Sequence, residues 1–232
     1  MLAAMFTSVN IRGMAQPKRG YHHGDLRNAL ISAAVDLAIE GGPPSVTVRA
    51  AARAVGVTAT AAYRHFQGRE ELLDATRQLA FDRLNESIAT NVARRSRHRE
   101  TVVDALLELA AVGRGYLDFA RRWPGLFRLV GLLVTDLANQ PEDSPFRTLS
   151  AAMDTLVEVG YLPAQRRPYA EISAWAGVHG LAMLYLDGPL RDANEEVRIH
   201  VNTRTIEILA EGLGGHAMPQ AAIEALRDAI GD

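Results

Sequence analysis

A nine-residue segment, TATAAYRHF at residues 58–66, constrains the fold of this chain more than any other part of its sequence. It has few large apolar side chains and is too short to form a stable helix alone, because helix nucleation is costly. Gly56 precedes it where a sharp turn is needed, and a second short helix is predicted at about 48–55. With Thr47 and Thr58 as N-caps, the two segments predict a helix-turn-helix.

The rest of the chain is also predicted to be helical, because apolar residues recur with a period of 3.6 and no segment alternates like a strand. Prolines lie at or near the predicted boundaries. A first helix capped by Asp25 and stopped near Gly41 is followed, after the helix-turn-helix, by helices at about 69–94, 99–121, 124–137, 145–160, 165–187, 193–213 and 219–230. We expect an all-α protein with a disordered segment at 1–17, a three-helix unit at 18–84 and a helical bundle domain at 85–232.

Composition and charge narrow the class of protein. The chain has no cysteine, which excludes disulfides, thiolate metal sites and cysteine nucleophiles. No apolar run approaches the roughly 18 residues that a membrane span needs, and no signal peptide is recognisable, so we expect a cytoplasmic protein without a membrane partner. Residues 1–69 carry eight basic and three acidic residues, whereas the remainder has a net charge of −7. This asymmetry favours a polyanionic partner for the N-terminal part.

The second short helix has side chains suited to contacting DNA. Its first residues are small, so the backbone can approach base edges closely, and Tyr63, Arg64 and His65 add hydrogen-bond donors. Thr47 and Arg49 lie at the start of the preceding helix, where backbone N–H groups and the helix dipole attract phosphate. The alternative is a helical hairpin without a special function.

These residues carry a family resemblance. The run TVRAAARAVGVTATAAYRHFQGREELL at 47–73, preceded by GYHHGDLRNALISAAVDLAIEGG at 20–42, resembles the DNA-binding domain of TetR-type transcriptional regulators over roughly residues 18–84. The segment AWAGVHGLAML at 174–184 is similar to the C-terminal domain of a branch named for its Trp, His and Gly, here Trp175, His179 and Gly180. The sequence departs from the family pattern in having Ala51 and Ala62 at positions that often hold larger aliphatic residues, and Ala59 at a position that is often basic.

The resemblance implies roles for individual residues in binding a double-stranded DNA operator. The residues implied to face the major groove are Thr58, Ala59, Thr60 and Arg64. Those implied mainly to hold phosphates are Thr47, Arg49, Tyr63, His65 and Arg69. An N-terminal arm with Lys18 and Arg19 either follows the DNA backbone or a minor groove, or is a solvated tail.

Catalytic and metal-binding interpretations find no support in the spacing of the polar residues. His22 and His23 are adjacent, so they point apart in regular structure, and no zinc-protease spacing is present. Ser173 and His179 are six residues apart on one predicted helix, about 240° around its axis, and cannot form a bonded pair. The glycines around 212–215 follow a helix, which is typical of a C-cap. We therefore expect no enzyme, no metal and no cofactor.

The predicted C-terminal domain is larger than dimerisation alone needs, which suggests that it also binds a small molecule. Trp175 and His179 are neighbours on one helix face and are either a buried structural pair or part of an effector pocket. The residues predicted to line a mainly apolar pocket are Tyr116, Phe119, Trp123, Phe127, Met153, Trp175, His179 and Met183, with Tyr185 as a further polar candidate. The residues predicted to form a homodimer interface, as a four-helix bundle, are Ile172, Ala176, Leu184, Val197, Val201 and Ile208.

The resulting hypothesis is a ligand-responsive, homodimeric repressor that binds a palindromic operator and is released by a small apolar effector of unknown identity. Two alternatives stay open from the sequence. One is an activator or dual regulator. The other is a helical small-molecule-binding protein without specific DNA binding, which the small side chains at Ala51 and Ala62 would suit.

Overall fold

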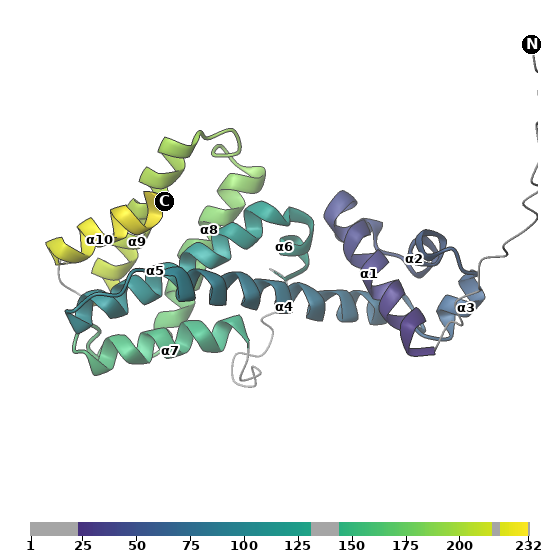
Figure 1. Ribbon diagram of the computed structural model, residues 1–232, viewed down its shortest axis with the longest axis horizontal. Helices are drawn as coiled ribbons and strands as arrows, with labels where there is room; N and C mark the ends of the chain where they lie inside the picture. The colour runs from purple at the N-terminus through teal and green to yellow at the C-terminus, as the bar shows by residue number, and fades with distance from the viewer. Residues whose placement is uncertain (1–22, 131–143, 215–218, 232) are drawn as a thin grey trace, which may run out of the picture.

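The computed structural model describes residues 23–130, 144–214 and 219–231, which form ten α-helices and two short 3-10 helices. The described residues contain no strand, so the predicted all-α class is confirmed. The helices α1, α2 and α3 lie together at one end, and α4 runs from them into the bundle formed by the remaining helices (Figure 1). The elements are α1 (His23–Gly41), η1 (Pro43–Ser45), α2 (Val48–Val55), α3 (Ala59–Tyr63), α4 (Arg69–Arg94), α5 (Thr101–Arg122), α6 (Pro124–Val130), α7 (Pro145–Glu158), η2 (Ala164–Arg166), α8 (Ala170–Asp187), α9 (Glu195–Gly214) and α10 (Gln220–Gly231).

The turn between α2 and α3 forms as predicted. Gly56 ends α2 in the left-handed region, with φ of 79°, where a residue with a Cβ atom would be strained. The hydroxyl oxygens of Thr47 and Thr58 accept hydrogen bonds from the backbone N–H groups of Ala50 and Ala61, at 3.1 and 3.2 Å. Both predicted N-caps are therefore confirmed.

Three predicted boundaries are wrong. The described part of the first helix already includes His23, so Asp25 lies within the helix and is not its N-cap. The helix α3 ends at Tyr63 and not near residue 66, because the next N–H groups bond mainly with the tighter spacing of three residues. The helix α8 begins at Ala170 and not near 165, because Tyr169 adopts the left-handed conformation, with φ of 61°, and this interrupts a helix on its N-terminal side. Of the helix predicted at 124–137, residues 131–137 lie outside the described residues.

One hydrophobic core joins the helix-turn-helix unit to the larger bundle. It contains Leu30 of α1 and Phe66 after α3, continues through Leu84 and Ile88 of α4, and reaches Phe127 of α6. All five side chains are at most 3% exposed. The helix α4 therefore contributes apolar side chains to a core that both parts of the chain share.

A second core lies at the far end of the bundle and holds α5, α7, α8, α9 and α10 together. Leu106 of α5, Met153 of α7 and Leu226 of α10 are buried in it. Tyr161, which follows α7, is 2% exposed, and its hydroxyl donates a hydrogen bond to the carbonyl of Ala210 at 3.1 Å. None of the described helices is long and apolar enough to cross a membrane.

Two glycines allow helices to approach each other more closely than other residues would permit. A Cβ atom on Gly125 of α6 would lie 1.6 Å from the carbonyl oxygen of Ala38 in α1. A Cβ atom on Gly115 of α5 would lie 2.5 Å from the Cα atom of Ile88 in α4. Contact between the backbones of α1 and α6 thus fixes how the first helix is seated on the bundle.

Candidate nucleic-acid interface and ligand cavity

The residues of α3 divide into a buried side and an exposed side. Ala62 and Phe66 are fully buried, so Phe66 belongs to the core, and the guanidinium of Arg27 stacks over its ring at 4.8 Å. Thr58, Thr60, Tyr63 and Arg64 are exposed, and Ala59 is half-buried. Tyr63 retains 44% of its accessible surface. The helix-turn-helix therefore presents small residues, a phenol and a guanidinium to solvent along one short segment.

The polar groups of this surface are available for hydrogen bonds with DNA. A threonine hydroxyl that accepts a capping bond still carries a proton, so Thr47 and Thr58 can each donate to a phosphate or a base. Arg49 and Arg64 are exposed and form no ion pair with any described residue. Such guanidinium groups fit bidentate recognition of phosphate or of guanine.

Two of the residues predicted to contact phosphate lie in a different environment from Arg49 and Arg64. Arg69 donates to the carbonyl of Pro43 at 2.8 Å and pairs with Glu70 at 3.0 Å, so it already links the start of α4 to η1. His65 is half-buried. Lys18 and Arg19 lie outside the described residues.

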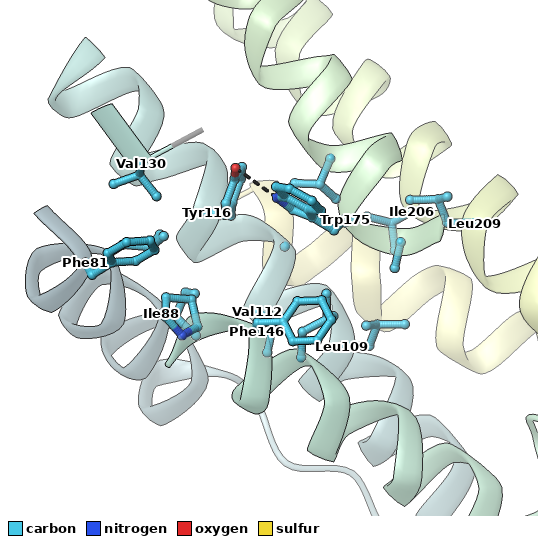
Figure 2. Close-up of a pocket in the computed structure, with 16 residues that line it drawn as sticks. Phe81, Ile88, Leu109, Val112, Tyr116, Val130, Phe146, Trp175, Ile206 and Leu209 are labelled. Atoms are coloured by element: carbon cyan, nitrogen blue, oxygen red, sulfur yellow. Dashed lines mark hydrogen bonds between the residues drawn. The ribbon is translucent and has the colours of Figure 1, made fainter. Parts of the chain in front are cut away.

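A second candidate site is an apolar cavity of about 70 Å³ in the larger bundle (Figure 2). Its walls come from five helices, α4, α5, α7, α8 and α9, together with Val130 at the end of α6. The aromatic lining residues are Phe81, Tyr116, Phe146 and Trp175. The cavity is smaller than the 300–1,000 Å³ typical of sites for drug-sized ligands. A ligand of that size would therefore have to move the walls, and one of these walls is α4.

The two polar lining residues, Tyr116 and Trp175, belong to a chain of hydrogen bonds that continues to His179, which does not line the cavity. Trp175 Nε1 donates to the Tyr116 hydroxyl at 3.1 Å, as the dashed line in Figure 2 shows, and this hydroxyl lies 2.8 Å from Nδ1 of His179. Because the indole can only donate, the tyrosine proton is best placed toward His179. Burial raises the pKa of Tyr116 to about 12, against a smaller opposing effect of the Trp175 hydrogen bond. Burial also lowers the pKa of His179.

Only Tyr116 and Trp175 of the residues predicted for the pocket line this cavity. Phe119 and Phe127 are fully buried in the first core, and His179 stacks on Phe127 behind Tyr116, with ring centroids 5.3 Å apart. Met153 is fully buried in the second core.

The other three candidates face elsewhere. Trp123 is half-buried and lies beneath the guanidinium groups of Arg83 and Arg122, at 5.6 and 4.7 Å. Met183 is on the surface. Tyr185 donates to Asn202 at 2.9 Å and lines a separate cleft.

The sequence analysis missed most of the residues that do line the cavity. They are aliphatic or aromatic residues at ordinary core positions, such as Phe81, Leu109, Val112, Phe146 and Ile206. Nothing in their spacing separates them from residues that fill the core, because a cavity forms where packing between helices is incomplete.

The residues proposed for dimerisation lie on α8 and α9. Ala176, Leu184, Val197 and Ile208 are exposed, and Ile172 and Val201 are half-buried. Ile208 retains 54% of its accessible surface, a high value for a large aliphatic side chain. The two helices thus leave apolar side chains uncovered in the single chain. Within the described ranges, no three histidine, aspartate or glutamate side chains come together as a metal site.

Comparison with known families matches both parts of the chain. Residues 30–76 match the family described as "Bacterial regulatory proteins, tetR family", and residues 109–209 match "Tetracyclin repressor-like, C-terminal domain". Neither match specifies the branch suggested by Trp175, His179 and Gly180. No curated protein matches the chain.

Solved structures share the fold. A protein of unknown function from Rhodococcus sp. RHA1 is 26% identical, with a TM-score of 0.62 over 85% of this chain and all of its own. A TetR family transcription regulator from Marinobacter aquaeolei VT8 is 19% identical, with a TM-score of 0.52 over 88% of this chain and 94% of its own. A TetR-family transcriptional regulator from Streptomyces coelicolor is 20% identical, with a TM-score of 0.50 over 90% of each chain.

Proposed function

Because the chain belongs to the TetR family of bacterial transcriptional regulators, we propose that it is a repressor that binds a palindromic operator as a homodimer and is released by an apolar effector. Family membership itself makes the chain a DNA-binding regulator and not an enzyme. We propose that it acts in the cytoplasm. The observation that carries the effector proposal is the apolar cavity, since one of its walls is the helix that also holds the DNA-binding unit.

The proposed coupling follows from the position of α4. Phe81, Leu84 and Ile88 line the cavity, and Leu84 and Ile88 also belong to the core shared with the helix-turn-helix. An effector that enlarges the cavity would push on α4 and move the attached α1–α3 unit. The effector needs only to bind the moved arrangement more tightly by a few kcal/mol to shift the population.

The polar wall suggests what such an effector carries. If the Tyr116 proton points to His179, its oxygen retains one free lone pair beside the cavity. An apolar molecule with one hydroxyl or N–H donor would complete this site, whereas a charged group would be poorly solvated among aliphatic side chains.

A thermal-shift screen of apolar phenols, followed by operator release, tests the effector proposal. The variant Ala174→Leu fills the cavity from a residue that is 4% exposed, and Ala151→Leu adds the same atoms at an exposed position of α7. We expect Ala174→Leu alone to lose ligand stabilisation and ligand-induced release. A ligand that stabilises the protein but leaves operator affinity unchanged contradicts the coupling.

Operator binding is tested by Arg64→Ala, which should weaken affinity by about 1–3 kcal/mol, or roughly 5- to 150-fold, if Arg64 reads a guanine bidentately. Tyr63→Phe should weaken it less, by the loss of one hydroxyl. The matched control is Arg99→Ala, because Arg99 is exposed and lies far along the chain from α3. Affinity should also fall steeply with salt. If Arg64→Ala and Arg99→Ala bind a selected operator with equal affinity, α3 does not recognise the operator sequence.

Dimerisation through α8 and α9 is tested by sedimentation. Ile208→Asp places a charge on the exposed apolar face and should shift the protein toward monomer, with loss of operator binding, since one short helix contacts too few base pairs. A parent protein that is monomeric at micromolar concentration and still binds the operator tightly contradicts the proposal.

A further inference from the structure

A large polar cleft separates the end of the DNA-binding unit from the bundle. It has a volume of about 810 Å³, within the range of small-molecule sites. One wall is the end of α1 with η1, at residues 39–44, and the other walls come from α5, α6, α8 and α9, with Arg191 from the loop between the last two. It shares no lining residue with the apolar cavity.

The lining of the cleft has an excess of positive charge. Five arginines line it, against the three carboxylates of Glu40, Asp118 and Glu195. The five are Arg114, Arg121, Arg128, Arg191 and Arg198. They come from three helices and one loop, so their convergence is a product of the tertiary fold and not of a basic run in the sequence.

Three of the arginines are already paired with carboxylates. Arg128 pairs with Asp187 at 2.6 Å, and Arg198 pairs with Glu195 at 3.5 Å. Arg121 lies 3.7 Å from Asp118, which also accepts a hydrogen bond from Asn91.

The remaining two, Arg114 and Arg191, form no ion pair with any residue in the described ranges. Arg114 is also half-buried in the middle of α5. A guanidinium that is partly removed from water without a carboxylate partner is a binding group for an anion, because its planar donors fit carboxylate and phosphate oxygens.

We propose that this cleft is a second ligand site, which binds a small organic anion carrying a carboxylate or a phosphate through Arg114 and Arg191. The aliphatic side chains of Leu117 and Ile199 line the same cleft and would contact the carbon skeleton of the ligand. Tyr185 and Asn202 form a hydrogen-bonded pair at its edge that can bind further polar atoms.

Like the apolar effector, such a ligand would act on the contact between the α1–α3 unit and the bundle, but it would hold the two parts together where the effector would move them. Its site includes the end of α1 and the α6 residues Pro124, Gly125 and Arg128, so a bound anion would hold the present seating of α1 on α6. It would therefore oppose any change in operator affinity that requires α1 to move on α6, a consequence that rests on the proposed function. This effect does not depend on whether the apolar cavity binds an effector.

The test is a thermal-shift and calorimetric titration of the full-length protein with succinate, citrate, inorganic phosphate and glucose 6-phosphate at constant ionic strength. We expect at least one probe to stabilise the protein at millimolar concentration or below, and the carboxylate and phosphate probes show which group is preferred. Arg114→Ala and Arg191→Ala should each weaken its binding at least tenfold, whereas Arg99→Ala removes the same charge from an exposed position outside the cleft and should leave it unchanged.

Two results would overturn the proposal. One is that no probe stabilises the protein beyond sodium chloride at equal ionic strength. The other is that the two cleft variants bind the probe as tightly as Arg99→Ala, because binding would then be unspecific. Arg191→Ala keeps the test valid if Arg114→Ala does not fold, since Arg191 is exposed on a loop. The variant Ala174→Leu, which fills the other cavity, should bind the anion normally.

Discussion

Replacing Gly125 by alanine should separate α1 from α6 and destabilise the protein. The new Cβ atom would lie 1.6 Å from the carbonyl oxygen of Ala38, and 2.9 Å from the Cα atom of Ile39. A carbon and an oxygen in contact are about 3.3 Å apart, so the two backbones must move apart by roughly 1.7 Å. Neither contacting atom belongs to a flexible side chain that could rotate away.

The expected cost is that of overpacking, about 1–3 kcal/mol. Alanine has the better helix propensity, by up to about 1 kcal/mol, which offsets part of this cost. A protein of this length loses roughly 2–4 °C in Tm for each kcal/mol, so the overpacking cost alone corresponds to a fall of about 2–12 °C by calorimetry, less the part that helix propensity offsets. Operator affinity should fall as well, since α1 seats the helix-turn-helix on the bundle.

The matched control is Gly113→Ala in α5. Its Cβ atom would lie 3.6 Å from a methyl group of Val178, which is an ordinary contact, and the residue is inside a helix. We expect Gly113→Ala to be neutral or slightly stabilising and to keep operator affinity. If Gly125→Ala unfolds at the same temperature as Gly113→Ala and binds the operator equally well, the close seating of α1 on α6 is refuted.

Three further changes probe other parts of the structure. Gly115→Ala should cost about 1–3 kcal/mol in denaturant unfolding, because its Cβ atom would meet the backbone of Ile88 at 2.5 Å; an unchanged midpoint would contradict that packing. Met153→Ala should cost about 2–5 kcal/mol, since the side chain is fully buried, but should leave ligand binding intact because it does not line the cavity. Burial lowers the pKa of His179, so below pH 6.5 the unfolded chain takes up a proton that the native state resists. The free energy of unfolding therefore decreases as the pH is lowered through this range, and above it the effect is absent. In His179→Asn the fall in Tm from pH 7 to 5.5 should be shallower, and an identical slope would show that His179 titrates freely.

Features set by neighbouring residues could be predicted from the sequence. The caps at Thr47 and Thr58 and the turn at Gly56 depend on a few adjacent positions, and the structure forms all three as expected. The start of α8 could not be predicted in this way, since it follows the left-handed Tyr169, a conformation that residues with a Cβ atom rarely adopt.

The position of side chains between helices could not be predicted in this way. Phe81 lines the cavity and Phe127 fills the core, although both are aromatic residues on amphipathic helices. Which of them meets empty space depends on how α4, α5 and α7 cross, and the sequence of one helix does not determine its crossing angle. The polar cleft escaped prediction for the same reason, since its arginines come from segments far apart in the chain.

The core shared by α1, α4 and α6 limits how this regulator can be recombined with others. A chimera that exchanges residues 23–84 would place a foreign first helix against Gly125, where the backbones of α1 and α6 meet without an intervening side chain. A first helix with a different path would leave a gap or a clash there. The chimera would then be less stable, whatever the DNA sequence preference of the exchanged residues. A transferable DNA-binding unit from this chain would therefore have to include α6 as well as α1, α2 and α3. The 26 residues of α4 and the 22 of α5 contribute to the same core and could not be exchanged separately from that unit without disrupting it.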